Sequence, residues 1–364
     1  MGKYKSTIIL SLALTVFLAS CKGTTTTPGP TGPTDPTGPT DPTGPTDPTG
    51  PTDPTDPPDP GTKSWVVTTL AGGFNEPSGV DVDSSGNVYV ADEGNNRIRK
   101  ITPAGEVSTF AGGTYGHQDG VGEAAQFIFP YGVAVDSSGN IYVAEFSGHR
   151  IRKITPAREV SILAGSTTGV SGSVNGVGTD ARFWSPRGVA VDSSGENVYV
   201  AGYWNNIIRK ITITTSEAGV VTATVSLFAG STTGVSGSVN GVGTDARFSG
   251  PSGVAVDSKG NVYVGDTHNN RIRKITPARE VTTIAGDGTE AQFNYPRGVA
   301  VDSSGNLYVA DQNNHRIRKI TSEGVVTTIA DGFNYPHGVA VDSSGSIVYV
   351  GDTHNNRIQK IEYK

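Results

Sequence analysis

The sequence contains a single cysteine, Cys21, and this scarcity excludes several kinds of site. An intramolecular disulfide needs two thiols, and a cysteine-based zinc site needs several, so neither can form. The 364 residues contain no HExxH motif, no GxSxG motif and no cysteine placed as a nucleophile. The sequence therefore predicts no catalytic residue, no metal site and no cofactor.

Positively charged side chains are also fewer than negatively charged ones. The chain carries 34 acidic side chains against 28 Lys plus Arg, a formal net charge of −6. Nucleic-acid-binding proteins present a cationic surface to the phosphates, so we expect no nucleic-acid partner. Aromatic residues make up only 7% of the chain, whereas glycine is abundant at 49 residues. Short apolar runs separated by glycine are typical of all-β repeat proteins, whose turns need positive φ.

No apolar run near the N-terminus is long enough to span a membrane. The stretch from Ile8 to Leu18 has about eleven residues and follows Lys3 and Lys5, which is typical of a secretory signal peptide over residues 1–20. Leu18-Ala19-Ser20-Cys21 resembles a bacterial lipobox, in which cleavage precedes the cysteine and the thiol takes a diacylglycerol. The alternative is an ordinary signal peptide followed by a chance cysteine.

The lipobox implies a lipid anchor at Cys21 and a location in the bacterial cell envelope. Lys22 stands where an Asp would resemble an inner-membrane retention signal, which favours the outer membrane, with the protein periplasmic or surface-exposed. Residues 21–63 then comprise the lipidated cysteine and a segment rich in Thr, Gly, Pro and Asp. This segment has no apolar residues to bury, so we expect a disordered, extended spacer.

Six internal repeats follow over residues 64–364 and decide the fold. Each copy begins with the phrase Pro-x-Gly-Val-x-Val-Asp, which starts at Pro77, Pro130, Pro186, Pro251, Pro296 and Pro336. Each continues with β-rich runs separated by turn residues, which predict strands a, b, c and d. Repeats of four strands predict an all-β fold, a six-bladed β-propeller.

The ends of the repeat region predict how the ring closes. The sixth copy contains strands a, b and c but no strand d, and residues 65–70 before the first copy match the d pattern. We therefore expect the N-terminal strand to complete the last blade, which would leave no open sheet edge.

The repeats resemble the NHL repeat family over residues 65–364. The residues that carry the resemblance are Pro296-Arg-Gly-Val-Ala-Val-Asp302 and Asp311-Gln-Asn-Asn-His-Arg-Ile-Arg-Lys-Ile320, with equivalents in each copy. The resemblance implies the propeller fold and says little about function, because one fold hosts many activities. Propellers of this family include binding modules, extracellular sensors, RNA readers and a few lyases.

Features present in every repeat are interpreted as structural. The Asp-Ser-Ser-Gly segments, such as residues 83–86, predict tight hairpin turns and not calcium sites. The Arg-Ile-Arg-Lys runs, such as residues 97–100, predict ion pairs with the acid that ends strand b, such as Asp92, and not a nucleic-acid patch. A phenylalanine lies three residues before each proline, and we expect it to be a core plug, that is, a side chain buried in the interface between two blades.

Departures from the repeat are the better candidates for function. The residue after each blade proline lies near the mouth of the channel and varies around the ring: Ser78, Tyr131, Arg187, Ser252, Arg297 and His337. Two guanidiniums, a phenol and an imidazole would suit an anionic or polar ligand. The alternative is a solvated rim that binds nothing.

A second group of departures is aromatic. Phe146, Trp184, Tyr203 and Trp204 replace polar residues of the second and third repeats or lie in the adjoining loop. Exposed aromatic side chains commonly mark contacts with sugars or proteins, whereas packing under long loops is the alternative.

The sequence thus predicts a membrane-anchored module that binds an extracytoplasmic protein or carbohydrate. The alternative is a metal-assisted lyase or hydrolase with its site at the top of the channel. Related propeller lyases and lactonases use channel residues and a metal, and Tyr131, Arg187, Arg297, His337 and Glu145 could imitate such a site.

Overall fold

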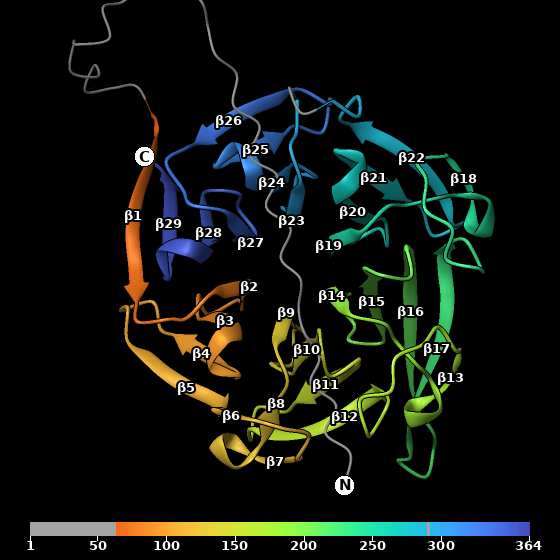
Figure 1. Ribbon diagram of the computed structural model, residues 1–364. Helices are drawn as coiled ribbons and strands as arrows, with labels where there is room; N and C mark the ends of the chain where they lie inside the picture. The colour runs from red at the N-terminus through yellow and green to blue at the C-terminus, as the bar shows by residue number, and fades with distance from the viewer. Residues whose placement is uncertain (1–62, 290–291) are drawn as a thin grey trace, which may run out of the picture. The chain divides into compact units, whose positions relative to one another are not determined.

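A computed structural model describes residues 63–289 and 292–364. The signal peptide, the lipidated Cys21 and the spacer predicted from the sequence, apart from its last residue Lys63, lie outside these residues. Six antiparallel sheets are arranged around a central axis (Figure 1), as the repeats predict. Among the described residues the only helical segments are short 3-10 turns, and none is long and apolar enough to cross a membrane.

Each sheet is one blade, counted from the chain's first complete repeat. The innermost strands a are β2 (Pro77–Val82), β9 (Pro130–Val135), β14 (Pro186–Val191), β19 (Pro251–Val256), β23 (Pro296–Val301) and β27 (Pro336–Val341). Strands b are β3 (Val88–Asp92), β10 (Ile141–Glu145), β15 (Asn197–Gly202), β20 (Val262–Asp266), β24 (Leu307–Asp311) and β28 (Ile347–Asp352). Strands c are β4 (Arg97–Ile101), β11 (Arg150–Ile154), β16 (Ile207–Thr215), β21 (Arg271–Ile275), β25 (Arg316–Ile320) and β29 (Arg357–Tyr363).

The outer strands d are β5 (Val107–Gly112), β12 (Glu159–Gly165), β17 (Val221–Gly230), β22 (Glu280–Ala285), β26 (Val326–Ala330) and, in the sixth blade, β1 (Trp65–Gly72). Two-residue strands add a fifth strand to blades two, three and four: β7 (Gly120–Val121), β13 (Gly176–Val177) and β18 (Gly241–Val242). A small parallel pair joins β6 (Thr114–Tyr115) to β8 (Gln126–Phe127).

The turns between strands and loops follow the sequence chemistry. Asp83 Oδ1 accepts hydrogen bonds from the backbone N–H groups of Ser85 and Asn87, at 3.0 and 2.8 Å, and Gly86 adopts a φ of 80°. The carboxylate therefore holds a tight a–b turn, and the interpretation of these segments as turns is confirmed. The b–c turns of blades one, four, five and six are 3-10 segments, whereas residues 146–149 and 203–206 form ordinary turns in blades two and three. The 3-10 segments are η1 (Glu93–Asn95), η5 (Thr267–Asn269), η6 (Gln312–Asn314) and η7 (Thr353–Asn355). Three more lie in the loops that lead from strand d to strand a: η2 (Gly122–Ala124), η3 (Gly178–Asp180) and η4 (Gly243–Asp245).

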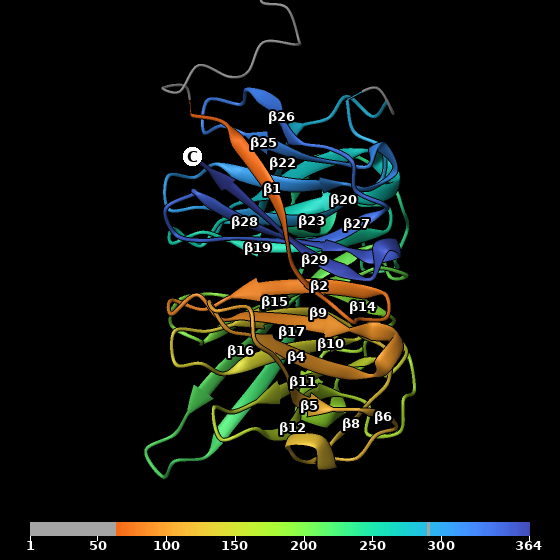
Figure 2. The ribbon, with the colours of Figure 1, turned by 90° about the vertical axis from the view of Figure 1, so that its left-hand side faces the viewer.

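The ring closes as the sequence predicts. β1 pairs antiparallel with β29 from Trp65 opposite Tyr363 to Gly72 opposite Arg357, so segments from the two ends of the repeat region lie side by side (Figure 2). The Ser64 N–H also donates to the Lys364 carbonyl at 2.6 Å. The last blade is therefore completed by the first strand.

The hydrophobic core is divided among the spaces between blades. One cluster joins Tyr89 and Ile98 of the first blade to Phe127 and Val143 of the second, and the other blade pairs have equivalent clusters. The predicted core plugs are all buried, namely Phe74, Phe127, Phe183, Phe248, Phe293 and Phe333. Burial of a phenylalanine in each interface stabilises the ring by about 1.5–3 kcal/mol per side chain.

A buried acid ends strand b in five blades and pairs with the arginines of strand c. In the fourth blade Asp266 accepts a hydrogen bond from Arg273 at 2.8 Å, and both side chains are fully buried. The predicted pairing of the Arg-Ile-Arg-Lys runs is confirmed by such contacts. Blade three has Gly202 at the acid position, and its buried Arg209 bonds to carbonyl groups and Asn175 instead. Burial lowers the pKa of Arg209 to about 10.

Candidate functional site

Two rings of residues meet at the top of the central channel. The first ring is the residue after each blade proline. The second is the first residue of each b–c turn, reading Glu93, Phe146, Tyr203, Thr267, Gln312 and Thr353 around the propeller. Contacts between the rings, such as Gln312 Nε2 to His337 Nε2 at 3.1 Å, show that both lie on one face.

The first ring is held in place by hydrogen bonds between neighbouring blades. The residue before each blade proline has a positive φ, for example 48° at Phe129 and 47° at Ser185. Its N–H donates to a side chain of the preceding blade, to Asn96 Oδ1 at 3.0 Å and to His149 Nδ1 at 3.0 Å respectively. A strained backbone persists where its surroundings hold it. His149 is thus a structural residue of the blade interface.

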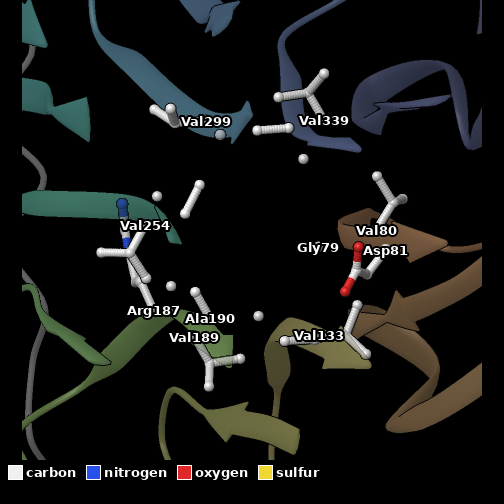
Figure 3. Close-up of a pocket in the computed structure, with 18 of the residues that line it drawn as sticks. Gly79, Val80, Asp81, Val133, Arg187, Val189, Ala190, Val254, Val299 and Val339 are labelled. Atoms are coloured by element: carbon white, nitrogen blue, oxygen red, sulfur yellow. The ribbon is translucent and has the colours of Figure 1, made fainter. Parts of the chain in front are cut away.

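Below the rings, the six strands a enclose a cavity of about 190 Å³ (Figure 3). Its wall consists mainly of glycine, valine and alanine from β2, β9, β14, β19, β23 and β27. The strands approach one another closely, because a Cβ placed on Gly132 would lie 2.2 Å from the carbonyl oxygen of Arg187. The repeated glycine therefore sets the diameter of an apolar channel beneath a polar mouth.

Three residues predicted from the sequence form one polar network at this mouth. Arg297 Nη1 donates to the Tyr131 hydroxyl oxygen, and that oxygen lies 3.4 Å from His337 Nδ1. The His337 ring also stacks on Tyr131, with centroids 5.9 Å apart. Residues from blades two, five and six therefore converge, although 166 and 206 positions separate Tyr131 from its two partners in sequence.

Arg187 completes the mouth from the third blade. Its guanidinium lies 3.6 Å from the centroid of the Tyr203 ring and 5.2 Å from that of Phe146. Its Nε and Nη1 atoms are buried, and so is Arg297 Nε. None of the three has a hydrogen-bond partner within the part of the chain that the structure describes. Burial lowers the pKa of Arg187. Buried donors without partners favour binding of an acceptor, because an unmade hydrogen bond costs about 1–3 kcal/mol.

Glu93 supplies the opposing charge at the mouth. Burial, followed by the nearby Glu76, raises the pKa of Glu93 to about 7, although Arg187 and Arg297 act in the opposite direction. Burial and the same two arginines hold the pKa of His337 well below its ordinary value, so its imidazole is neutral at pH 7. Two guanidiniums therefore face one carboxyl whose pKa is raised to about 7, and the mouth carries net positive charge.

The predicted aromatic patch is only partly continuous. Tyr203 lies 6.5 Å from Phe146 and 5.0 Å from Trp204, measured between ring centroids, and its hydroxyl lies 2.8 Å from His268 Nε2. Trp204 is exposed. Trp184 is also exposed, but in the described portion of the chain it makes no ring contact with the other three. A line of ring contacts therefore runs from the channel mouth through the buried Tyr203 to the exposed Trp204.

Sequence reasoning missed two residues of the mouth and misplaced one. Glu93 and Gln312 are departures at the first position of the b–c turn, so comparing the repeats at that position would have found them. Glu145 is a correction: it is fully buried, pairs with Arg150 and Arg152 and accepts the Ile128 N–H at 3.1 Å. It is the acid of its blade and does not reach the channel mouth.

The mouth does not fit a metal ion. Among residues 63–289 and 292–364, no group of three or more His, Cys, Asp or Glu side chains is placed to hold one. The two guanidiniums at the mouth would also repel a cation, because like charges in a partly buried site interact strongly.

Comparison with known families identifies the repeats. The model described as NHL repeat matches residues 74–101, 127–154, 248–275, 293–320 and 333–361. NHL repeat-containing protein 2 of Bos taurus is 29% identical over 161 residues, which is 41% of this chain and 22% of that protein. Protein SUPPRESSOR OF QUENCHING 1, chloroplastic, of Arabidopsis thaliana is 31% identical over 156 residues, which is 40% of this chain and 14% of that protein. The chain thus spans about a fifth or less of the length of these curated relatives.

Solved structures share the architecture at low sequence identity. A structural genomics protein of unknown function from Bacteroides thetaiotaomicron has a TM-score of 0.60 at 18% identity, covering 83% of this chain and 77% of that chain. Virginiamycin B lyase from Staphylococcus aureus has a TM-score of 0.54 at 16% identity, covering 83% and 100%. A gluconolactonase from Xanthomonas campestris has a TM-score of 0.58 at 13% identity, covering 82% and 89%.

These likenesses concern the fold alone, since one fold supports many activities. The six sheets, their closure and the five matched segments agree with one another. The chain is therefore an all-β, six-bladed β-propeller with NHL repeats.

Proposed function

We propose that this propeller is a binding module that captures an extracytoplasmic ligand through an anionic group at the mouth of its channel. The observation that carries the proposal is the pair Arg187 and Arg297, two guanidiniums from different blades that meet at one channel mouth and keep buried donors available for an anionic group. Beside this charge lie the tilted rings of Phe146, Tyr203 and Trp204, of which Trp204 is exposed and offers an apolar contact. A carboxylate on a sugar or on a peptide side chain suits both features.

The proposal includes the lipid anchor and the membrane location predicted from the sequence. A lipid at Cys21 would hold the module at the outer membrane, and the spacer would let the propeller reach ligands away from the lipid surface. We propose binding in preference to metal-assisted lyase or hydrolase chemistry, because the mouth is cationic and Glu145 is engaged inside its blade.

The test is a thermal unfolding experiment on the purified full-length protein with glucuronate and with glucose as the neutral control. A ligand at 100 times its Kd stabilises the folded state by about 2.7 kcal/mol, which corresponds to a rise in Tm of roughly 5 °C for a domain of this size. We expect glucuronate to raise Tm and glucose to have no effect.

The matched variant is Arg187→Ser/Arg297→Ser, since blades one and four carry serine at the same position. It should fold and lose the response to glucuronate. The proposal is wrong if a panel of carboxylates, including acidic sugars and acidic peptides, leaves Tm of the wild type unchanged.

A further inference from the structure

A further departure from the repeat lies inside the channel, three residues along strand a from the mouth. The phrase Gly-Val-x-Val-Asp has alanine at x in five blades, at Ala134, Ala190, Ala255, Ala300 and Ala340. The first blade has Asp81 instead. A residue that every blade needs for folding would recur, so a single acid among five alanines is not required by the architecture.

The carboxylate of Asp81 belongs to the wall of the cavity. Figure 3 shows it between Val80 and Val133 at the edge of the open channel, and Asp81 lines the same cavity as Arg187. Its two oxygens accept the N–H groups of Val82 at 2.9 Å and Val135 at 2.7 Å. These backbone donors fix the carboxylate in position. In the described part of the chain no cationic side chain forms an ion pair with it.

The apolar surroundings of Asp81 change the pKa of its carboxyl group. Burial raises the pKa of Asp81 to about 6, with a smaller contribution in the same direction from Asp83. A carboxylate in an apolar channel is stabilised by a cation that reaches it. An inorganic divalent cation would need several oxygen ligands, whereas an ammonium group can pair with a single carboxylate.

The distance between Asp81 and the channel mouth sets the length of a ligand that could contact both. Three residues of strand separate it from the level of Ser78, which corresponds to roughly 10 Å at 3.3 Å per residue. The wall between the two levels is formed by the ring Val80, Val133, Val189, Val254, Val299 and Val339. The channel thus has a cationic mouth, an apolar middle and an anionic residue below.

We propose that the channel binds a two-ended ligand, with a carboxylate at Arg187 and Arg297, an unbranched apolar segment along the valine ring and an ammonium group at Asp81. This inference rests on the proposed function of the mouth and names the class of ligand: an ω-amino carboxylate or a lysine-like chain. A cavity of about 190 Å³ has room for such a chain.

The experiment compares ω-aminooctanoate with octanoate by isothermal titration calorimetry on the full-length protein. The two probes share the carboxylate and the chain and differ only in the ammonium group. We expect the wild type to bind ω-aminooctanoate at least about tenfold more tightly, which corresponds to one charge-assisted hydrogen bond.

The test variant is Asp81→Ala, which installs the residue that the other five blades carry and is therefore expected to fold. It should lose the preference for the amino ligand and keep the affinity for octanoate. Arg187→Ser should weaken both ligands. Should Asp81→Ala unfold, Asp81→Asn provides a neutral side chain of the same shape.

The outcomes separate the two proposals. If octanoate or glucuronate binds but the ammonium group adds nothing, or if Asp81→Ala keeps the preference, the two-ended ligand is wrong and the binding of an anionic group at the cationic mouth stands. If no carboxylate binds the wild type, the proposed function and this inference fail together. If octylamine binds as tightly as ω-aminooctanoate, the cationic mouth takes no part and the two-ended ligand is again wrong.

Discussion

Replacing Asp266 with alanine tests whether the buried acid of a blade acts mainly by neutralising a buried arginine. Asp266 is fully buried and accepts hydrogen bonds from the Ser249 N–H, Asn269 Nδ2 and Arg273 Nη1, each at 2.8 Å. The substitution leaves the Arg273 guanidinium buried without a carboxylate. Breaking a buried pair in this way costs about 3–5 kcal/mol, so we expect Tm to fall by roughly 6–10 °C.

The sixth blade provides a matched control, Asp352→Ala. Asp352 accepts equivalent bonds from the Asn334 N–H at 2.7 Å and Asn355 Nδ2 at 2.9 Å, but the position of Arg273 is occupied by the neutral Gln359. Its ion-pair partner Arg357 has a side chain that is 35% exposed and can be solvated. Unsatisfied donors alone cost about 1–3 kcal/mol, so Asp352→Ala should lower Tm by roughly 2–6 °C.

The assay is calorimetric unfolding of the wild type, the two alanine variants and the double variant Asp266→Ala/Arg273→Gln. The double variant copies the glutamine of blade six and should recover part of the loss caused by Asp266→Ala. Equal losses for Asp266→Ala and Asp352→Ala, or no recovery in the double variant, would refute the argument that the buried guanidinium dominates.

Three further predictions concern the mouth and the channel. Affinity for glucuronate should fall several-fold between pH 6 and pH 8, because ionised Glu93 competes for the guanidiniums, and Glu93→Gln should flatten that profile in calorimetric titrations. Gly132→Ala should lower Tm markedly, because its Cβ would lie 2.2 Å from a neighbouring carbonyl oxygen, whereas Gly72→Ala should be neutral since nothing lies within 4 Å.

The stability of the wild type should fall as pH rises from about 4 to 6 relative to Asp81→Ala. The folded protein keeps the proton of Asp81 up to about pH 6, while the unfolded chain loses it near 3.8. Stability therefore declines over this window by about 1–3 kcal/mol, and denaturant unfolding at several pH values measures it. A pH-independent difference between the two proteins would count against a raised pKa of the partly buried Asp81 carboxylate.

The fold was largely predictable because each structural requirement recurs in five or six of the repeats. The hairpin aspartates, the interface phenylalanines and the pairing of strand-c arginines with the acids of strand b all recur at fixed spacing, and the structure confirms them. Closure of the ring was predictable because a segment with the pattern of strand d precedes the first copy, while the sixth copy has no strand d.

The candidate site was only partly predictable. The ring after the blade prolines was found from its variability, and the structure brings Tyr131, Arg297 and His337 into contact. Glu93 was missed because it follows an acid that every blade except the third shares, so it resembles ordinary turn chemistry. Glu145 was placed wrongly because an acid near other departures resembles a site residue, whereas only its contacts show that it is the blade's own buried acid.

By itself the sequence determined the number of blades, the strand order within each blade and the way in which the ring closes. These follow from hydrophobic spacing and turn residues, which are local properties repeated along the chain. Only the tertiary structure decided which departures act together. Closing the ring brings side chains from different blades to one axis, and the proximity of Arg187 to Tyr131, or of Asp81 to the same channel, depends on that geometry.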